Sequence, residues 1–383
     1  MSLQLENLSL TVDGQPHIYT TNLTLEKSTM NVLLGPTLSG KTSLMRLMAG
    51  LDKPTTGRIL WNDQDVTNTR VQDRDIAMVY QQFINYPSMS VYENIASPLK
   101  LMKKSKAEID KRVKKSADMM KLGPYLDRKP LELSGGQQQR CALARALVKG
   151  SGLVLLDEPL ANLDYKLREE LRAEIPKIFA ESGAIFVYAT TEPEEALLLG
   201  GNTATLNAGR ITQFSKTSSV YHQPQDTITA KTFSNPPMNF LKLRKKDTTI
   251  TLGSSVQSED FTAKNERQDQ MATNSTLTTS SLHFDGLADG DYIAGFRPNH
   301  LELSQQSPES IAFNATLKIT EITGSETFLH MQYDDDHWVG LVHGIHDLTL
   351  GENIQVFLDP SHIYTFDLAG KIVSSASYAT EIA

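Results

Sequence analysis

Residues 35–42, GPTLSGKT, hold two glycines, a lysine and a hydroxyl residue in the spacing G-x-x-x-x-G-K-T. Gly35 and Gly40 permit tight backbone turns, so consecutive N–H groups can point inward at phosphate oxygens. Lys41 would then reach the β- and γ-phosphates of a nucleotide, and the Thr42 hydroxyl would bind magnesium. The candidate nucleotide-binding residues of this segment are Gly35, Pro36, Thr37, Leu38, Ser39, Gly40, Lys41, Thr42 and Ser43.

Both flanks of this segment favour a phosphate-binding loop over a chance run of glycines. The apolar run MNVLL before it predicts a buried strand, and KTSLMRLMAG, residues 41–50, predicts a helix. A helix that begins near Lys41 adds the positive end of its dipole to the site. Strand, glycine-rich loop and helix therefore come in the order that phosphate binding requires.

Two adjacent carboxylates, Asp157 and Glu158, end a second apolar run, GLVLLDE. In open α/β sheets, ligands bind beyond the carboxyl ends of the strands, which is where these side chains would lie. Asp157 suits the support of a magnesium ion. Glu158 suits the general base for an attacking water, because neighbours along a strand point in different directions. Alone, the pair would fit a solvated strand end, and the phosphate loop upstream favours the catalytic interpretation.

The segment LSGGQ, residues 133–137, predicts a helix start with unusual backbone access. Ser134 can cap a helix over 135–149, and Gln137 can complete a capping box. Gly135 and Gly136 would leave bare N–H groups at the helix N-terminus, where a phosphate can approach closely. A plain helix start is the alternative, but the position between the phosphate loop and the acidic pair favours a phosphate contact.

The elements that must position these residues predict an α/β domain over 1–235, with a largely parallel sheet. The apolar run AIFVYAT predicts a third buried strand, and residues 164–183 predict a long helix. A Lys-rich, mostly helical stretch over about 88–132 interrupts this alternation and predicts an inserted helical subdomain. The last part of the chain, 236–383, has short alternating runs that predict a small antiparallel, barrel-like β-domain. Within it, the polar stretch 253–281 predicts a long loop.

Composition limits what the chain can do. The 383 residues carry a net charge of −8, which argues against a general nucleic-acid binder. The single cysteine, Cys141, excludes an intramolecular disulfide. No secretory signal is expected at the N-terminus, and no apolar run approaches the roughly 20 residues that span a bilayer. Any work on a membrane would therefore go through a partner.

In the order of these motifs, the chain resembles the ATPase subunits of ABC transporters. The phosphate loop is followed by Gln81 in MVYQQ (the family's Q-loop), the signature LSGGQ, LVLLDE (the Walker B motif) and ANLD, the D-loop, which ends at Asp164. Within this family, the chain most resembles the carbohydrate importers of the maltose type. A narrower resemblance is to the glycerol or glycerol-phosphate uptake subgroup. The resemblance extends into the C-terminal part of the chain, through the segments FSNPPMNFLKL, AGFRPNHLEL, EITGSETFLHMQ and DPSHIYTFD. It implies that the C-terminal β-domain is OB-like, of the TOBE type.

The resemblance implies a mechanism that uses ATP and Mg2+. Two ATPase subunits would pair head-to-tail, so that each ATP lies between one P-loop and the partner's Ser134, Gly135, Gly136, Gln137 and Asp164. Gln81 would contact the metal and the attacking water, and the helical subdomain would grip a membrane-spanning permease subunit. A solute-binding protein would take part indirectly, and nucleic acid would not. The expected location is the cytoplasmic face of the inner membrane, as a peripheral subunit.

Two positions depart from the family pattern. Thr191 stands where the family has a histidine that touches the γ-phosphate, and Val12 falls where an aromatic residue stacks on adenine; Tyr19 lies too late in the chain. A neutral threonine contact should be roughly half as strong as a charge-assisted one. The favoured hypothesis is therefore a slow ATP site in this chain and a heterodimer with a second, histidine-bearing ATPase subunit. A homodimer in which Thr191 substitutes for the histidine is the alternative.

Two other functions compete with transport as interpretations of these motifs. A DNA-repair or chromosome-maintenance ATPase would need a long coiled coil between P-loop and signature, and the chain has room only for a short insertion there. A structural ATP-binding subunit that completes a partner's site fits Thr191, but the presence of Lys41, Asp157 and Glu158 argues against it. For the C-terminal β-domain, dimer stabilisation and sensing both stay open.

Overall fold

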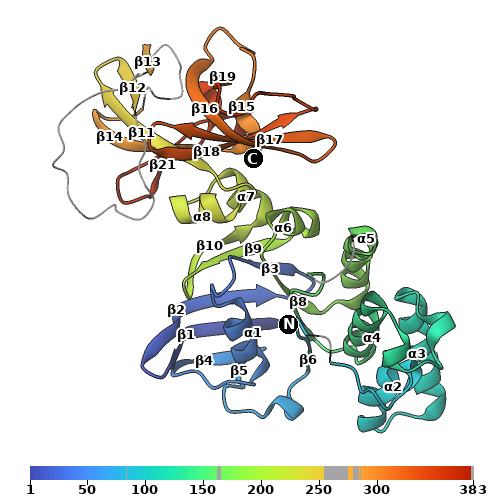
Figure 1. The fold of residues 1–383 in the computed structure, drawn as a ribbon. Coiled ribbons are helices and arrows are strands. Elements are labelled where there is room, and N and C mark those ends of the chain that lie inside the picture. The colour runs from blue at the N-terminus through green and yellow to red at the C-terminus, as the bar shows by residue number, and fades with distance from the viewer. Residues whose placement is uncertain (83, 162–164, 254–274, 279–283, 285, 381–383) are drawn as a thin grey trace. The chain divides into compact units, whose positions relative to one another are not determined.

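The computed structural model describes all residues except 83, 162–164, 254–274, 279–283, 285 and 381–383. The chain divides into two compact units, Met1–Thr217 and Ser218–Ala383 (Figure 1). The expected D-loop residue Asp164 lies outside the described residues, as does most of the expected loop 253–281. Among the described helices, none is long and apolar enough to cross a bilayer.

The first unit contains a four-stranded antiparallel sheet. Its strands, in spatial order, are β2 (Gln15–Glu26), β1 (Ser2–Val12), β4 (Thr56–Trp61) and β5 (Gln64–Asp65). In β1, leucines alternate with polar residues, so Leu3 and Leu5 point into the core while Gln4 lies between them on the other face. The alternation explains why this sheet covers the core with one face only.

A six-stranded sheet carries the residues of the candidate site. Its strands, in spatial order, are β10 (Arg210–Lys216), β9 (Asn202–Asn207), β3 (Met30–Leu34), β8 (Ile185–Thr190), β7 (Leu153–Asp157) and β6 (Ile76–Val79). All neighbours pair in parallel except β10 with β9. The strands β3, β7 and β8 are buried along their whole length, as expected for continuous apolar runs in a parallel sheet. The three strands expected from the sequence are confirmed.

Helix α1 (Lys41–Ala49) lies against both sheets of this unit. Its Leu44 and Met48 share one buried cluster with Leu5 of β1 and Leu155 of β7. Helices α5 (Tyr165–Ser182) and α6 (Pro193–Leu199) belong to the same unit. The two helices expected over 41–50 and 164–183 are therefore present, with ends that differ by a residue.

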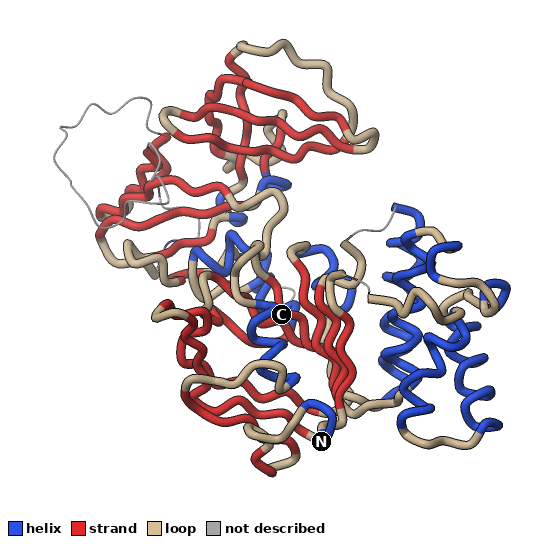
Figure 2. The backbone as a smooth tube through the Cα atoms, turned by 60° about the horizontal axis from the view of Figure 1, so that its bottom comes forward, coloured by secondary structure: helices blue, strands red, loops and turns tan. Residues whose placement is uncertain are grey.

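The expected helical subdomain is also present. Its helices are α2 (Val91–Leu101), α3 (Lys106–Met119) and α4 (Gly135–Val148), and the unit has single 3-10 turns η1 (Val71–Asp73), η2 (Gly123–Tyr125) and η3 (Pro130–Glu132). Figure 2 shows the helices grouped at one side of the strands of this unit. Helices α2 and α3 fall inside the expected range, and α4, which begins at the signature, packs against both.

The second unit is built from two antiparallel sheets that share a buried cluster, and a second, smaller cluster lies in the same unit. The first sheet contains β13 (Ser275–Thr278), β12 (Thr249–Gly253), β11 (Asn239–Lys246), β14 (Gly290–Phe296), β20 (Tyr364–Phe366) and β21 (Ile372–Ser374). The second contains β15 (Leu301–Glu302), β19 (Asn353–Leu358), β16 (Ile311–Ile322), β17 (Glu326–Tyr333) and β18 (Asp336–His343). Leu243 and Phe296 of one sheet share a buried cluster with Phe313 and Trp338 of the other. The all-β prediction is confirmed, while β13 is a strand inside the expected loop.

The second unit begins at Ser218, earlier than the expected boundary at 236. Short helices α7 (Thr217–His222) and α8 (Thr227–Thr232) precede its first strand, and η5 (Pro298–His300), η6 (Pro360–His362) and α9 (Ser377–Thr380) follow later. The buried guanidinium of Arg297 donates to the carbonyls of Tyr221 (2.6 Å) and Phe233 (2.7 Å). These hydrogen bonds connect the segment of α7 and α8 to the β-strands. The alternation of apolar and polar residues in the strands does not predict such bonds.

Candidate nucleotide-binding site

The loop after β3 has the backbone that a phosphate cradle needs. Gly40 is left-handed, with φ +104°, and serves as the N-cap of α1. At Gly35 a side chain is excluded by contact, because a Cβ atom there would lie 2.3 Å from the Leu206 carbonyl oxygen. The Ser39 N–H donates to the Pro36 carbonyl at 3.2 Å, which closes the turn. The two glycines of the motif are therefore required by geometry, one by its φ angle and the other by crowding.

Lys41 is buried inside this loop. Its Nζ donates to the carbonyl oxygens of Gly35 (2.8 Å) and Pro36 (3.0 Å) and lies 3.4 Å from Glu158 Oε1. Burial lowers the pKa of Lys41, and the charge of Glu158 opposes that shift. The side chain is only 4% exposed, so the ammonium group is directed inward at the loop rather than into solvent.

Glu158 also meets Gln81, which follows strand β6, the neighbour of β7 in the sheet. The Gln81 amide Nε2 donates to Glu158 Oε2 at 3.0 Å, which leaves the carboxylate held between Gln81 and Lys41. Glu158 has φ +45°, a left-handed backbone that non-glycine residues seldom adopt. Its own N–H donates to the Ala189 carbonyl of β8 at 3.0 Å. Glu158 therefore contacts Gln81 and Lys41, whereas the neighbouring Asp157 has a hydrogen bond with the Thr42 side chain.

Asp157 lies at the buried end of β7, beside helix α1. It is 3% exposed, and burial raises the pKa of its carboxyl group, while a hydrogen bond with the Thr42 side chain opposes this. Magnesium prefers oxygen ligands and often keeps waters between itself and a carboxylate. The Thr42 hydroxyl, the Asp157 carboxylate and the Gln81 amide oxygen are a donor set of that kind, so the residues fit the ion.

The signature segment begins α4 as expected. The Ser134 side chain accepts from the Gln137 N–H (3.4 Å) and Gln137 Oε1 accepts from the Ser134 N–H (3.0 Å), so the predicted capping box is confirmed. A Cβ atom on Gly135 would meet nothing within 4 Å. Over the described residues, no hydrogen bond joins 134–137 to the phosphate loop. The glycine start of α4 is open in the chain by itself.

Thr191 follows the carboxyl end of β8, in the neighbourhood of the phosphate loop. The carbonyl of the preceding residue, Thr190, accepts from the Gly35 N–H at 3.3 Å, and Thr191 itself is exposed. Val12, the position expected near adenine, ends β1 and is 39% exposed. One face of the Tyr19 ring is covered by Arg210, whose Cζ lies 3.5 Å from the ring centroid. This face of the Tyr19 ring is therefore not available to stack on an adenine base.

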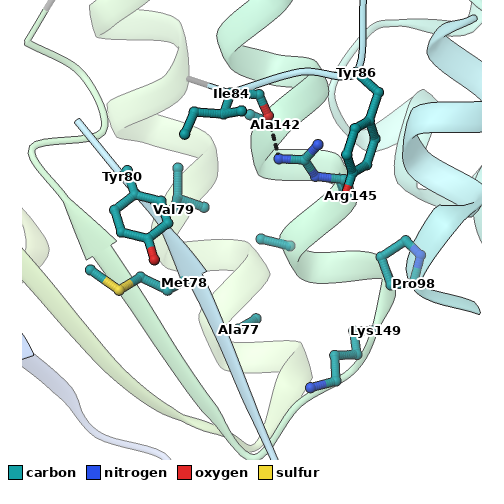
Figure 3. A pocket seen from close by; sticks show the side chains of 11 residues that line it. Ala77, Met78, Val79, Tyr80, Ile84, Tyr86, Pro98, Ala142, Arg145 and Lys149 are labelled. Carbon is teal, nitrogen blue, oxygen red and sulfur yellow. Dashed lines mark hydrogen bonds between the residues drawn. The ribbon is translucent and has the colours of Figure 1, made fainter. Parts of the chain in front are cut away.

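A groove of about 300 Å3 lies between β6 and the helices α2 and α4, and its lining includes Tyr80, the sequence neighbour of Gln81 (Figure 3). Its apolar lining comes from Ala77, Met78, Val79, Ile84, Pro98, Ala142 and Ala146, with Tyr80, Tyr86, Arg145 and Lys149 around them. Arg145 stacks over the Tyr86 ring at 5.0 Å and donates to the Ile84 carbonyl. The groove therefore has an apolar floor and two cationic side chains, and its lining contains no carboxylate.

Sequence reasoning missed a charged network beside Thr191. Glu192 and Glu195 of the α6 segment meet Arg168 and Arg172 of α5, and the shortest of these contacts are 2.7 and 2.8 Å. The available signal was the spacing of the two glutamates, three residues apart at the start of a helix. Such a pair ordinarily indicates only a favourable helix N-terminus, which is why it attracted no functional interpretation.

Comparisons with known proteins agree with this geometry. The family model described as ABC transporter matches residues 18–161. The trehalose/maltose import ATP-binding protein MalK of Thermococcus litoralis is 37% identical over 88% of this chain and 89% of its own length. The sn-glycerol-3-phosphate import ATP-binding protein UgpC of Psychromonas ingrahamii is 33% identical over 96% of this chain and 94% of its own.

Solved structures show the same cassette. A dimeric structure of MJ0796, a bacterial ABC transporter cassette, matches with a TM-score of 0.52 and 28% identity, over 56% of this chain and 98% of that one. A post-hydrolysis dimer of the same cassette bound to ADP and Pi gives a TM-score of 0.51 over the same shares. With Lys41, Asp157 and Glu158 in place and relatives that span nearly the whole chain, this protein belongs to the ATP-binding, ATP-hydrolysing subunits of ABC transporters.

Proposed function

We propose that this chain powers the import of a carbohydrate or a polyol such as glycerol or its phosphate. The convergence of Lys41, Gln81 and Glu158 at the phosphate loop carries the proposal. The names of the relatives give the solute class, because they describe import of trehalose and maltose or of sn-glycerol-3-phosphate. The solute itself would be recognised by a permease and, indirectly, by a solute-binding protein.

Hydrolysis in this proposal divides among a few side chains. Lys41 neutralises the terminal phosphates, and the loop amides around Gly40 hold their oxygens. Glu158 accepts the proton of the attacking water, which Gln81 orients. Thr42, Asp157 and Gln81 would hold magnesium, which supplies charge neutralisation to the phosphates when bound.

The other half of each site comes from a neighbouring ATPase subunit. Ser134, Gly135, Gly136 and Gln137 of that subunit, together with Asp164, would cover the nucleotide held by this chain's loop. The open surroundings of Gly135 and the bare N–H groups at the start of α4 support this assignment. A phosphate can approach there as closely as the backbone allows.

Replacing Gly135 with alanine separates this role from folding. The added Cβ meets open space and alanine favours a helix over glycine, so thermal stability should be kept or raised. Turnover should fall about tenfold or more, because the methyl group would weaken a hydrogen bond to a charged phosphate. Steady-state ATPase assays and thermal melts measure both effects.

Gly286→Ala is the matched control, since a Cβ there also meets nothing within 4 Å and lies in the other unit. It should leave turnover unchanged. Full activity in the Gly135→Ala protein would contradict the shared site and, with it, the pairing of two subunits through the signature.

The groove beside Gln81 is proposed as the docking place of the membrane-spanning permease. Tyr80 lines the groove and neighbours Gln81 in sequence, so an occupant would lie next to a residue of the reaction site. Arg145 and Lys149 favour an occupant that brings a carboxylate. Such docking would place the chain at the cytoplasmic face of the inner membrane as a peripheral subunit, with no role for nucleic acid.

We further propose that the second ATPase subunit differs from this chain. Thr191 offers a short neutral hydroxyl where the family has a histidine, so the site built on this phosphate loop would turn over slowly. The intact LSGGQ could still complete the partner's faster site. A heterodimer with a histidine-bearing subunit follows, and a homodimer is the competing arrangement.

The variant Thr191→His tests this point. A charge-assisted contact is stronger than a neutral one by about 1.4 kcal/mol, so kcat of the purified chain should rise about tenfold. Thr191→Val, which keeps the size and removes the hydroxyl, is the control and should not gain. Rapid turnover by the unmodified chain alone would remove the reason for a second subunit.

A structural ATP-binding subunit remains the second candidate, favoured by Thr191. It would bind ATP and complete the partner's site without turning over its own nucleotide. The two candidates differ in what Glu158 does for transport by the assembled complex.

A further inference from the structure

A buried carboxylate, Glu195, lies four residues after Thr191 and is not one of the expected phosphate-binding residues. It belongs to the first turn of α6 and is 5% exposed. The hydroxyl groups of Tyr188 and Thr190 both donate to its Oε2, at 3.0 and 2.6 Å. A buried carboxylate needs such donors, and both of these lie near the carboxyl end of strand β8, just before Thr191.

Tyr188 acts as a fixed donor in this arrangement. Burial in the sheet, followed by the charge of Glu195, raises the pKa of Tyr188 well above its ordinary value. The phenol therefore keeps its proton near neutral pH and donates to the Glu195 carboxylate. Because strand β8 is buried along its whole length, the ring has little freedom to leave this position.

Thr190 connects this carboxylate to the phosphate loop. Its hydroxyl donates to Glu195 and accepts from the Glu192 N–H at 3.0 Å. Its carbonyl accepts from the Gly35 N–H at 3.3 Å. The residue just before Thr191 is thus held on one side by α6 and on the other by the first glycine of the loop.

Two arginines of α5 complete the network. Arg168 Nη1 donates to Glu192 Oε1 at 2.8 Å, and Arg172 Nη2 donates to Glu192 Oε2 at 2.7 Å. Arg172 Nη2 also lies 3.4 Å from Glu195 Oε1. Glu192 and Glu195, which both follow Thr191 in the chain, are therefore held by one helix, which begins at Tyr165, directly after the D-loop segment of the sequence.

We propose that Glu195 is a positioning residue for ATP hydrolysis, which fixes the backbone at Thr190 and so sets the distance from side chain 191 to the phosphates. This inference rests on the proposed function of the site. In this proposal Glu195 acts through the hydroxyl groups of Tyr188 and Thr190 and not by direct contact with the nucleotide. A small displacement of a group at the phosphates is enough to lower turnover strongly.

The test removes the hydrogen bonds of the Thr190 hydroxyl while the volume of the side chain is kept. Thr190→Val keeps the branched side chain and deletes both hydroxyl bonds, while Thr190→Ser keeps the hydroxyl. We expect Thr190→Val to lower kcat about tenfold with the Kd for ATP unchanged, and Thr190→Ser to keep most of the activity. Tyr188→Phe, which deletes one donor, should lower kcat by a smaller factor and serves if Thr190→Val folds poorly.

The same change is made in the Thr191→His protein. There, the gain from the histidine should disappear when Thr190 is valine, because the imidazole would no longer be held at the phosphates. Thr203→Val is the control for lost stability: Thr203 is fully buried in the same sheet and its hydroxyl pairs with Thr217 at 2.9 Å. It should lower the melting temperature and leave kcat as it is.

Equal losses of kcat in Thr190→Val and Thr203→Val, or an unchanged kcat in Thr190→Val, would overturn the proposal and leave the network a structural one. The proposed function fails in a different way, through lost ATP binding or through a missing gain in the Thr191→His single variant. Because Thr190→Val is also measured in the unmodified chain, a missing histidine gain does not affect the test of Glu195.

Discussion

Glu158→Gln is expected to lower kcat for ATP hydrolysis by about 10²–10³-fold while ATP still binds. The amide keeps the size of the side chain and can accept from Gln81, which now donates to Glu158 Oε2 at 3.0 Å. It cannot take a proton from water, so the loss falls on the chemical step. Single-turnover hydrolysis and equilibrium ATP binding measure the two parts separately.

The measurement is made in the unmodified chain and in the Thr191→His protein, so that a slow site does not hide the loss. Glu170→Gln, a carboxylate in the same unit that pairs with the exposed Lys121, is the control. In the assembled transporter, collapse of transport in Glu158→Gln would support the catalytic subunit. Unchanged transport would instead favour the structural ATP-binding subunit.

Lys41→Met is expected to weaken ATP binding by about 10²–10⁴-fold. The ammonium group makes charge-assisted hydrogen bonds to phosphate oxygens, each worth about 1.5–3 kcal/mol, and two of them lost together give an effect of that size. Methionine is an unbranched side chain of similar length, so it should leave little empty volume at this buried position. Titration with a fluorescent ATP analogue measures the change in Kd.

Lys111→Met, on the exposed surface of α3, is the control and should bind ATP as the unmodified chain does. A thermal melt of the Lys41→Met protein checks that the loop still folds without its central donor. An unaltered ATP affinity in a folded Lys41→Met protein would contradict the assignment of residues 35–42 as the phosphate loop.

The sequence predicted those parts of the site whose geometry follows from local rules. A glycine–lysine–threonine loop between a strand and a helix, and a carboxylate pair at a strand end, can each be placed with short-range arguments. The convergence of Lys41, Glu158 and Gln81 follows because parallel strands end at one edge of the sheet. The capping box of Ser134 and Gln137 was likewise predictable, since it involves residues three apart.

What could not be predicted depends on contacts between distant segments. The bonds from Arg297 to the carbonyls of Tyr221 and Phe233 move the start of the second unit to an earlier residue, and no local pattern carries that information. The left-handed φ of Glu158 is also set from outside, by the bond from its N–H to β8. The network around Glu195 draws on three segments and has no signature in any one of them.

The contacts of Lys41 have a consequence for the energetics of nucleotide binding. Its ammonium group donates to the Gly35 and Pro36 carbonyls and lies 3.4 Å from Glu158 Oε1, so its three N–H groups already have oxygen partners. We expect a phosphate oxygen that binds Lys41 to replace at least one of these partners. The measured affinity for a nucleotide would then be the difference between the new phosphate contact and the contact that it replaces.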